Sequence, residues 1–337
     1  MNLLVNILEQ QLFIFTLISI MVIVSVYKEH QVLDDVYLVI RRVVPNDQMF
    51  ILIMSTIYGI LPVPGRISIA TGMFDTCTNE KKPRGELGIL AYLATHHYYL
   101  WSPLEKSVII VLASAGITYI QFLNYMGIYI AMMITMTVYY VLFIMGPVQI
   151  LNFKKTGKTR VLDPLILIGG VMICCVGLVD VKLFFPIYGL YVVCRYKVLN
   201  IISRVDWKLI IIACVIISAS TVIKAHSDQL IGILNTITTQ YGLHVSLIAS
   251  FTAALLLGSS SKFAAITALM VSIYGVAYLP IFYIFDFCGY LLSPSHKCVH
   301  IGRLYFKTKL VAFYKVVGII TLILMLTSII KTLMINE

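Results

Sequence analysis

Long apolar runs separated by short basic segments dominate the chain. Runs of about 18 or more nearly uncharged residues are typical of membrane-spanning helices. The run 107–147 is too long for one crossing at about 1.5 Å per residue, so we expect it to turn back near 124–125. The pattern predicts an all-α polytopic integral membrane protein with about eight to eleven membrane segments. The longest runs lie at about 11–27, 49–63, 107–147, 164–194, 209–223, 243–258, 263–285 and 310–330.

Composition supports this class of protein and argues against two others. Of the 337 residues, 60% are apolar and 12% are charged, whereas a soluble domain carries about 25% charged residues. The net charge of +10 is spread over short loops, as is usual for the cytoplasmic flanks of membrane helices. Nucleic-acid binding would need one clustered basic face. We therefore expect a multi-pass protein of the cell membrane, surrounded by the lipid bilayer, with no nucleic-acid partner.

A basic segment divides the chain near its middle. Residues 152–162 contain four basic side chains and no acidic one. Such a segment between apolar runs is typical of a cytoplasmic linker. The sequence therefore predicts a first membrane repeat over 1–151, a basic cytoplasmic linker over 152–162, and a second membrane repeat over 163–337.

Both halves show the same order of features. In the first half an apolar run is interrupted at 61–66, and a polar-aromatic segment ending at Pro103 precedes another apolar helix. In the second half the interruption lies at 258–262, and a similar segment at 289–296 precedes the last apolar helix. Corresponding interruptions at similar spacing predict two structural repeats, with broken helices or re-entrant hairpins that meet near mid-membrane.

The two interruptions carry residues suited to binding a small solute. Proline cannot lie inside an unbroken helix, and a break within a bilayer is tolerated only in contact with protein or with a wet cavity. Half-helix N-termini present N–H groups to anions, while unwound carbonyl groups can hold cations. A basic residue follows each break, although its side chain could instead reach the membrane interface. The candidate substrate- and ion-binding residues are Pro62, Pro64, Gly65, Arg66, Gly258, Ser259, Ser260, Ser261 and Lys262.

The histidines and cysteines give weaker signals. His96 opens an aromatic segment that is more typical of a belt at the membrane interface than of a metal site. His296 and His300 flank Cys298 at a spacing compatible with zinc, but no second ligand cluster accompanies them in the sequence. The seven cysteines lie mostly in apolar runs, where they behave as small hydrophobes. We therefore predict no metal site and no cofactor apart from a coupling ion.

Three segments resemble one family of membrane proteins. Leu61-Pro62-Val63-Pro64-Gly65, the Gly258-Ser259-Ser260 break and the string from Leu292 to Cys298 are similar to the DUF401 proteins. These belong to the ion transporter superfamily, together with citrate, gluconate and dicarboxylate permeases and some sodium–proton antiporters. The resemblance covers about 48–310 and implies an inverted-repeat transporter that forms a homodimer. Arg66 departs from it, because the family tends to have a small residue there. By position, the resemblance implies a site at Pro62, Pro64, Gly65, Gly258, Ser259 and Ser260, and adds Ser293, Pro294 and His296.

The leading functional prediction is secondary active transport of a small anionic solute, with an organic acid as the expected class. Coupling to Na⁺ or H⁺ would make the chain a symporter that works by alternating access. A Na⁺/H⁺ antiporter and a passive channel remain alternatives. An antiporter should place buried carboxylates at the breaks, whereas Asp286 lies away from them. Asp286 follows a long apolar run, where it could bind a proton or a cation, but a helix cap is the expected role. Neither a phosphate-binding GxxxxGK[ST] loop nor an HExxH motif occurs, so we expect no enzymatic activity.

Overall fold

Helices make up all of the regular secondary structure in the described part of the chain, which contains no strand. This agrees with the all-helical class expected from the sequence. The computed structural model describes residues 2–30, 32, 40–60, 85–103, 105–148, 162–175, 178–205, 207, 210–211, 214–215, 242–296, 298–300 and 306–335. The predicted site residues Pro62, Pro64, Gly65 and Arg66 lie outside these ranges, as does the predicted linker apart from Leu162.

The helices follow the apolar runs of the sequence, with additional breaks. In the first half they are α1 (Asn2–Glu29), α3 (Asp47–Ile60), α5 (Gly85–Ala94), the 3₁₀ helix η1 (His97–Leu100), α6 (Lys106–Ala115), α7 (Tyr119–Tyr139) and the π-helical turn η2 (Tyr140–Ile144). In the second half they are α8 (Leu162–Cys175), α9 (Val181–Arg195), η3 (Ile202–Arg204), α12 (Leu243–Leu257), α13 (Ser260–Tyr274), η4 (Val276–Tyr278), α14 (Leu279–Leu292) and α16 (Leu310–Ile335).

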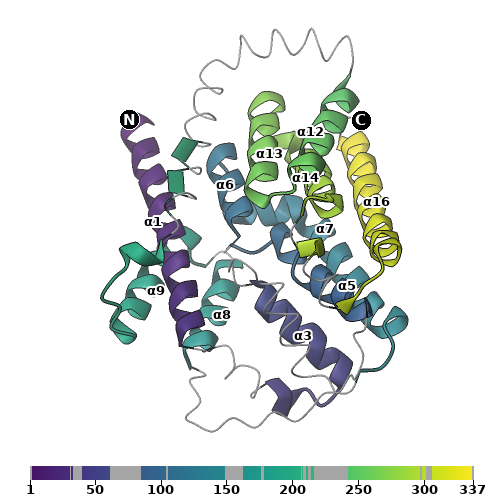
Figure 1. The fold of residues 1–337 in the computed structure, drawn as a ribbon. Coiled ribbons are helices and arrows are strands. Elements are labelled where there is room, and N and C mark those ends of the chain that lie inside the picture. The colour runs from purple at the N-terminus through teal and green to yellow at the C-terminus, as the bar shows by residue number, and fades with distance from the viewer. Residues whose placement is uncertain are drawn as a thin grey trace.

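Helices from both halves of the chain pack together. Helix α14 lies between α12 and α16, and α13 packs against α6 of the first half. Helix α1 packs against α9, and with α8 they lie at the left in Figure 1. The largest buried cluster contains residues from both halves, including Tyr92 of α5 and Tyr283 of α14. The core thus joins α5 of the first half to α14 of the second.

The 107–147 run turns at Gly116, not near 124–125. Gly116 ends α6 with φ 69° and ψ 35°, a left-handed conformation that favours glycine. The hydroxyl of Thr118 then accepts a hydrogen bond from the backbone N–H of Gln121 (3.2 Å), whose side-chain oxygen accepts from the N–H of Thr118 (2.8 Å). This reciprocal capping fixes the start of α7. The predicted turn near 124–125 is therefore wrong, because those residues lie inside α7.

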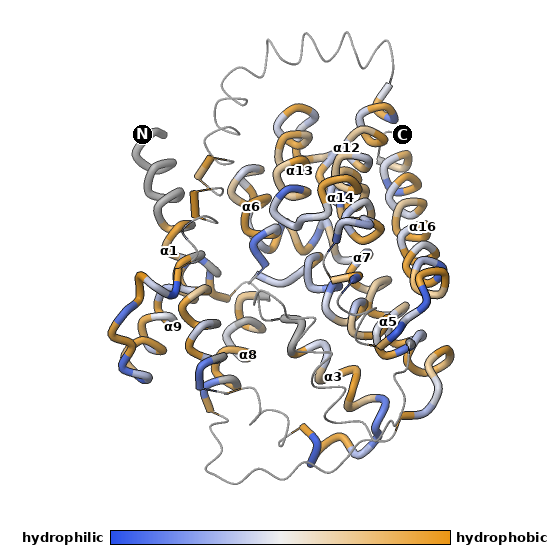
Figure 2. The backbone as a smooth tube through the Cα atoms, viewed as in Figure 1, coloured by the Kyte–Doolittle hydropathy of each residue, from blue (hydrophilic) through white to orange (hydrophobic). Residues whose placement is uncertain are grey.

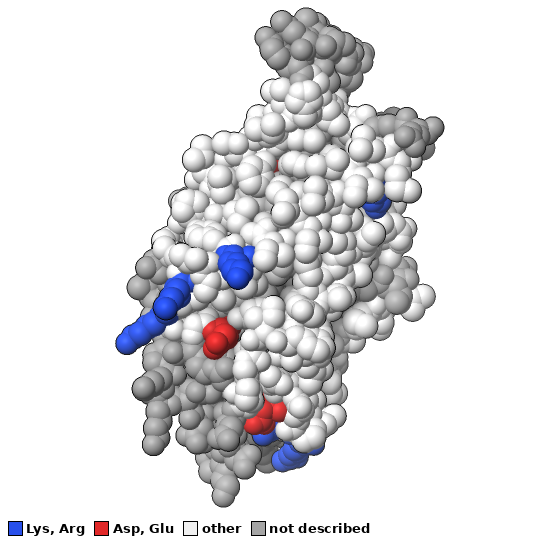
Figure 3. Space-filling model, turned by 90° about the vertical axis from the view of Figure 1, so that its right-hand side faces the viewer, with Lys and Arg blue, Asp and Glu red and all other residues white. Residues whose placement is uncertain are grey.

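Two helices in the described part of the chain are long and apolar enough to cross a membrane. They span Tyr119–Ile144 (26 residues) and Leu310–Met334 (25 residues), and only 28% of an 18-residue apolar stretch within each is buried. Large apolar side chains such as Phe143 therefore face outward. Figure 2 shows hydrophobic residues along most of the helices, and few charged side chains appear on the face in Figure 3. An extensive uncharged surface of this kind favours association with a membrane.

The close contact between α12 and α14 depends on Gly289. A Cβ atom there would lie 2.4 Å from the backbone oxygen of Phe251 and 3.1 Å from Cβ of Ala254. We expect Gly289→Ala to push the helices apart and to lower the stability of the detergent-solubilised protein by about 1–3 kcal/mol, measured by thermal unfolding. Gly318→Ala in α16 is the control, because an added Cβ meets nothing within 4 Å there. It should be neutral or stabilising by up to about 1 kcal/mol. Equal changes in stability for Gly289→Ala and Gly318→Ala would contradict the close approach of α12 to α14 at Gly289.

Candidate binding site at two helix breaks

The predicted interruption in the second half is present as a break between α12 and α13. Gly258 ends α12 with φ 53° and ψ 32°, and its N–H donates to the carbonyl oxygen of Ala254 (3.1 Å). Ser259 then precedes α13, and its side chain makes no capping hydrogen bond to that helix. The Ser259 and Ser261 hydroxyl oxygens lie 3.3 Å apart. The first turn of α13 therefore begins beside two hydroxyl groups that can bind a ligand.

A second break follows α14. The helix ends at Leu292, and 293–296 form a turn in which the Ser293 and Ser295 hydroxyl oxygens are 2.9 Å apart. The N–H of His296 donates to the carbonyl oxygen of Ser293 (3.2 Å), which closes the turn. Pro294 supplies no N–H group and therefore suits a position where the helix stops. We refer to Gly258–Ser259 as the α12–α13 break and to 293–296 as the α14 break.

The two breaks touch each other. The hydroxyl of Ser295 donates to the carbonyl oxygen of Leu256, at the end of α12 (3.1 Å). A Cβ atom on Gly258 would lie 2.3 Å from Oγ of Ser295, 2.6 Å from Oγ of Ser293 and 3.0 Å from the backbone nitrogen of His296. Only glycine fits this approach without displacement. The structure therefore brings Gly258 together with Ser293 and His296, which are 35 or more positions apart in the sequence.

The remaining candidates lie at the start of α13 and differ in burial. Ser260 is buried, whereas Ser259 and Ser261 are partly exposed. Lys262 is exposed and lies in the first turn of the helix, next to the α12–α13 break. Its ammonium group can therefore bind a solute at the break or extend to the membrane interface, the two roles considered from the sequence.

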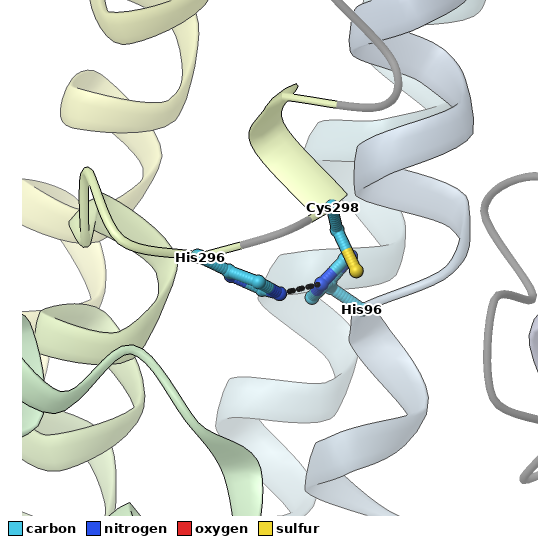
Figure 4. A group of neighbouring side chains, drawn as sticks. All are labelled: His96, His296 and Cys298. Carbon is cyan, nitrogen blue, oxygen red and sulfur yellow. Dashed lines mark hydrogen bonds between the residues drawn. The ribbon is translucent and has the colours of Figure 1, made fainter.

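His96 joins this region from the first half of the chain. It follows the last residue of α5 closely, and its Nε2 atom lies 3.4 Å from Nε2 of His296 in the α14 break. Cys298 approaches the same point from the short helical segment 298–300, and one ligand atom from each of the three residues lies within 4.8 Å of the others. Figure 4 shows the two imidazole rings pointing toward each other with the sulfur beside His96.

Hydrogen bonds determine which ring nitrogens carry protons. Nδ1 of His96 lies 2.6 Å from the carbonyl oxygen of Tyr92, so Nδ1 is the donor. The Tyr92 hydroxyl donates to the carbonyl oxygen of Leu291 (2.8 Å) and therefore accepts from Nδ1 of His296 (3.1 Å). With both Nδ1 atoms protonated, each neutral ring has its lone pair on Nε2. The two lone pairs then face each other.

The histidine pair lies in an aromatic core rather than at a surface. His96 and His296 are 0% and 3% exposed. The ring of Tyr92 stacks on His96 with 4.0 Å between centroids, and Tyr290 lies 4.1 Å from His296. The segment 97–100 is buried as well. The interpretation of the His96 segment as an interfacial belt is therefore wrong, because belt residues face the headgroup region.

Asp286 lies in the middle of α14 and does not cap a helix. Its side chain is 0% exposed, and Oδ2 accepts a hydrogen bond from the hydroxyl of Thr267 in α13 (2.6 Å). Ser250 of α12 lies beside the carboxyl, but its hydroxyl donates to the carbonyl oxygen of Leu247 (3.1 Å). Oδ1 has no hydrogen-bond partner among the described residues. The sequence offered a proton- or cation-binding role for Asp286 only as the lesser alternative, because the three helices that enclose it meet only in the folded chain.

Comparison with known proteins adds no assignment. No protein-family model matches the chain, and no curated protein sequence matches it. The similarity to the DUF401 proteins therefore stays a prediction that depends on the break residues themselves. Of those residues, the second-half set lies in the described part of the chain, where Ser293 and His296 approach Gly258.

Proposed function

We propose that the chain is a multi-pass membrane transporter that binds a small anionic solute where the two helix breaks meet. The observation that carries this proposal is the contact between the α12–α13 break and the α14 break, through Ser295 and Leu256. Interrupted helices leave backbone groups open for binding, and membrane proteins keep such breaks where they are enclosed by protein or line a cavity. An organic acid is the class of solute that we propose.

Reciprocal contacts between the halves support two structural repeats. In each half, a helix ending at a polar turn (α5 or α14) is followed later by a long apolar helix (α7 or α16). Helix α5 packs against α16, and α14 packs against α7. The rings of Tyr92 and Phe313 meet edge to face at 75°, and those of Tyr283 and Phe122 at 76°. A two-fold axis between repeats produces paired contacts of this kind.

The start of α13 provides the chemistry for an anion. A helix N-terminus carries a partial positive charge and exposes N–H groups, which favour a carboxylate. Ser259 does not cap these groups with its side chain, and Lys262 adds a full positive charge in the same turn. The hydroxyl groups of Ser259 and Ser261 are suited to bind the same ligand. These features together favour an organic anion over a cation as the solute.

Asp286 is the residue that we assign to coupling. A carboxylate at 0% exposure beside two hydroxyl groups, those of Thr267 and Ser250, is costly as a charged group, so it is most stable when a proton or another cation neutralises it. Hard metal cations are held by several oxygen atoms. Among the described residues these two hydroxyls lie at the carboxyl, and that of Ser250 also donates to the carbonyl oxygen of Leu247. We therefore propose H⁺ as the coupling ion, with Na⁺ as the competing outcome.

Ligand-dependent unfolding tests the binding site. We expect one of citrate, gluconate or succinate to raise the melting temperature of the purified, detergent-solubilised chain. A ligand at 100 times its Kd adds about 2.7 kcal/mol of stability. Ser259→Ala should lower the affinity for that ligand by about tenfold or more, because a hydrogen bond to a charged group is lost. Ser272→Ala, in the same helix, removes a hydroxyl that bonds within α13 (2.8 Å) and should leave the affinity unchanged.

Other outcomes would favour the alternatives. If pH or Na⁺ shifts the melting temperature and none of the carboxylates does, a Na⁺/H⁺ antiporter replaces the symporter. If carboxylate uptake into proteoliposomes neither saturates nor depends on an ion gradient, a passive channel replaces it. Equal ligand affinity in Ser259→Ala and Ser272→Ala would place the solute away from the α12–α13 break.

A further inference from the structure

We propose that His96, His296 and Cys298 bind one transition-metal ion of the Zn²⁺ type, through the two Nε2 atoms and the thiolate sulfur. The proposal does not depend on the transported solute. It also replaces our expectation of no metal, which was drawn from a sequence in which His296 and Cys298 had no second ligand cluster. His96, which precedes His296 by 200 positions in the sequence, supplies the missing ligand.

The spacing of the two nitrogen atoms fits a shared metal. Tetrahedral Zn²⁺ with bonds to nitrogen of about 2.0–2.1 Å holds its ligand nitrogens about 3.3–3.4 Å apart, and the Nε2 atoms are separated by 3.4 Å. With a bond to sulfur of about 2.3 Å, the matching distance from nitrogen to sulfur is about 3.6 Å. The ligand atoms lie within 4.8 Å of one another, so the distance from the Cys298 sulfur to either nitrogen must shorten by about 1.2 Å at most to complete the site.

The protonation of the rings leaves both Nε2 atoms able to bind a metal ion. Both Nδ1 atoms donate to oxygen atoms of Tyr92, which leaves both Nε2 lone pairs facing each other. A metal ion, a proton shared by the two rings or a hydrogen bond from the Cys298 thiol can satisfy this arrangement. We favour the metal, because two imidazoles and a thiolate converging within 4.8 Å form a set of strong metal ligands.

Tyr92 orients both metal-binding rings. Histidine ligands of metals usually donate their other N–H to a carbonyl, a carboxylate or water, which fixes the tautomer and the ring orientation. Here the carbonyl oxygen of Tyr92 accepts from His96 and its hydroxyl oxygen accepts from His296. The tyrosine hydroxyl is itself fixed by its hydrogen bond to Leu291. The outer contacts that a metal site requires are therefore already made.

The donor set selects the class of metal. Two imidazoles and a thiolate suit Zn²⁺, Co²⁺ and copper, whereas Mg²⁺ and Ca²⁺ require oxygen ligands. Three protein ligands leave a fourth tetrahedral position, as in zinc sites that bind water or a small ligand. Because the ligands come from the end of α5 and from the segment after α14, the metal would link the two halves of the chain.

Cobalt binding tests the site in the full-length chain. The purified protein, freed of any histidine tag and stripped with a chelator, is titrated with Co²⁺ and then with competing Zn²⁺. We expect one equivalent of Co²⁺ with the visible spectrum of four-coordinate cobalt and a sulfur-to-cobalt charge-transfer band. Cys298→Ser should abolish the charge-transfer band. His96→Ala should weaken Co²⁺ binding by at least about 100-fold, because loss of a direct ligand should cost no less than loss of an outer contact, which costs about 10–100-fold. His244→Ala, at an exposed position in the first turn of α12, is the control and should bind as the unaltered chain does.

X-ray absorption at the zinc edge provides a measurement without substitution. We expect one sulfur at about 2.3 Å and two imidazole nitrogens at about 2.0 Å. Cys298→Ser keeps the size of the side chain, so it tests the sulfur even if His96→Ala fails to fold. A chain that takes up no Co²⁺ or Zn²⁺ at one equivalent would overturn the proposal. A spectrum without sulfur, or equal affinity in His96→Ala, would overturn it too, and the proton-shared histidine pair would then account for the short contact.

Discussion

Asp286→Asn is expected to abolish the proton flux that accompanies carboxylate uptake, while carboxylate binding persists. Asparagine has nearly the shape of a protonated aspartate and cannot release a proton. Proteoliposomes loaded with a pH-sensitive dye measure the flux when the carboxylate that stabilises the protein is added outside. We expect the flux to fall at least about tenfold, since a group that carries the proton cannot be replaced by a neutral one. The ligand-dependent rise in melting temperature should stay.

The environment of Asp286 explains the size of this effect. The side chain is enclosed by α12, α13 and α14, with Thr267 as its hydrogen-bond donor. A charged carboxylate there loses its hydration and receives in return hydrogen bonding from the Thr267 and Ser250 hydroxyls at most, so the neutral form is favoured. Release of the proton requires a second conformation in which water reaches the group. This requirement is what couples proton movement to the motion of a carrier.

Asp180→Asn provides the matched control for this substitution. Asp180 is exposed and caps α9 by accepting a hydrogen bond from the N–H of Lys182 (2.7 Å). The same chemical change there should leave both the flux and the ligand-dependent melting unchanged. Undiminished proton flux in Asp286→Asn would contradict the assignment. Loss of a ²²Na⁺ flux in place of a proton flux would identify Na⁺ as the coupling ion.

Local signals in the sequence predicted the helices and several of their ends. The break at Gly258 follows from a glycine and three serines in an otherwise apolar run, and the structure has it. The turn at Gly116 had an equally local signal, a glycine followed by Thr118 and Gln121 in the pattern of a capping box. The turn expected near 124–125 rests on the length of the 107–147 run alone and ignores the capping residues at Thr118 and Gln121.

Contacts between distant segments were beyond the sequence. His96 and His296 lie 200 positions apart, so neither could be recognised as the partner of the other. Asp286 was expected to cap a helix because it follows a long apolar run, yet that run divides at Gly275 and leaves the carboxyl in the middle of α14. Asp286 is buried because three helices pack around it, and the local sequence around Asp286 does not indicate which helices these are.

Gly258→Ala is expected to disrupt the contact between the two breaks and to lower the affinity for the carboxylate by more than tenfold. Two costs add at this position. A left-handed conformation (φ 53°) costs a non-glycine residue about 1–2 kcal/mol. In addition, the new Cβ would lie 2.3 Å from Oγ of Ser295 and 3.0 Å from the backbone nitrogen of His296. The serine can rotate away only by giving up its hydrogen bond to Leu256, and the backbone must move as well.

Gly116→Ala separates the two costs. Gly116 ends α6 in nearly the same conformation (φ 69°, ψ 35°) and is exposed, so alanine there meets the conformational strain in an open position. Both variants should lose about 1–2 kcal/mol of stability from strain. Only Gly258→Ala should lose further stability and the ligand-dependent rise in melting temperature. If Gly258→Ala and Gly116→Ala unfold alike and bind the carboxylate alike, the α14 break does not constrain the α12–α13 break. The solute would then have to bind through α13 alone, and Ser293 and His296 would drop out of the proposed site.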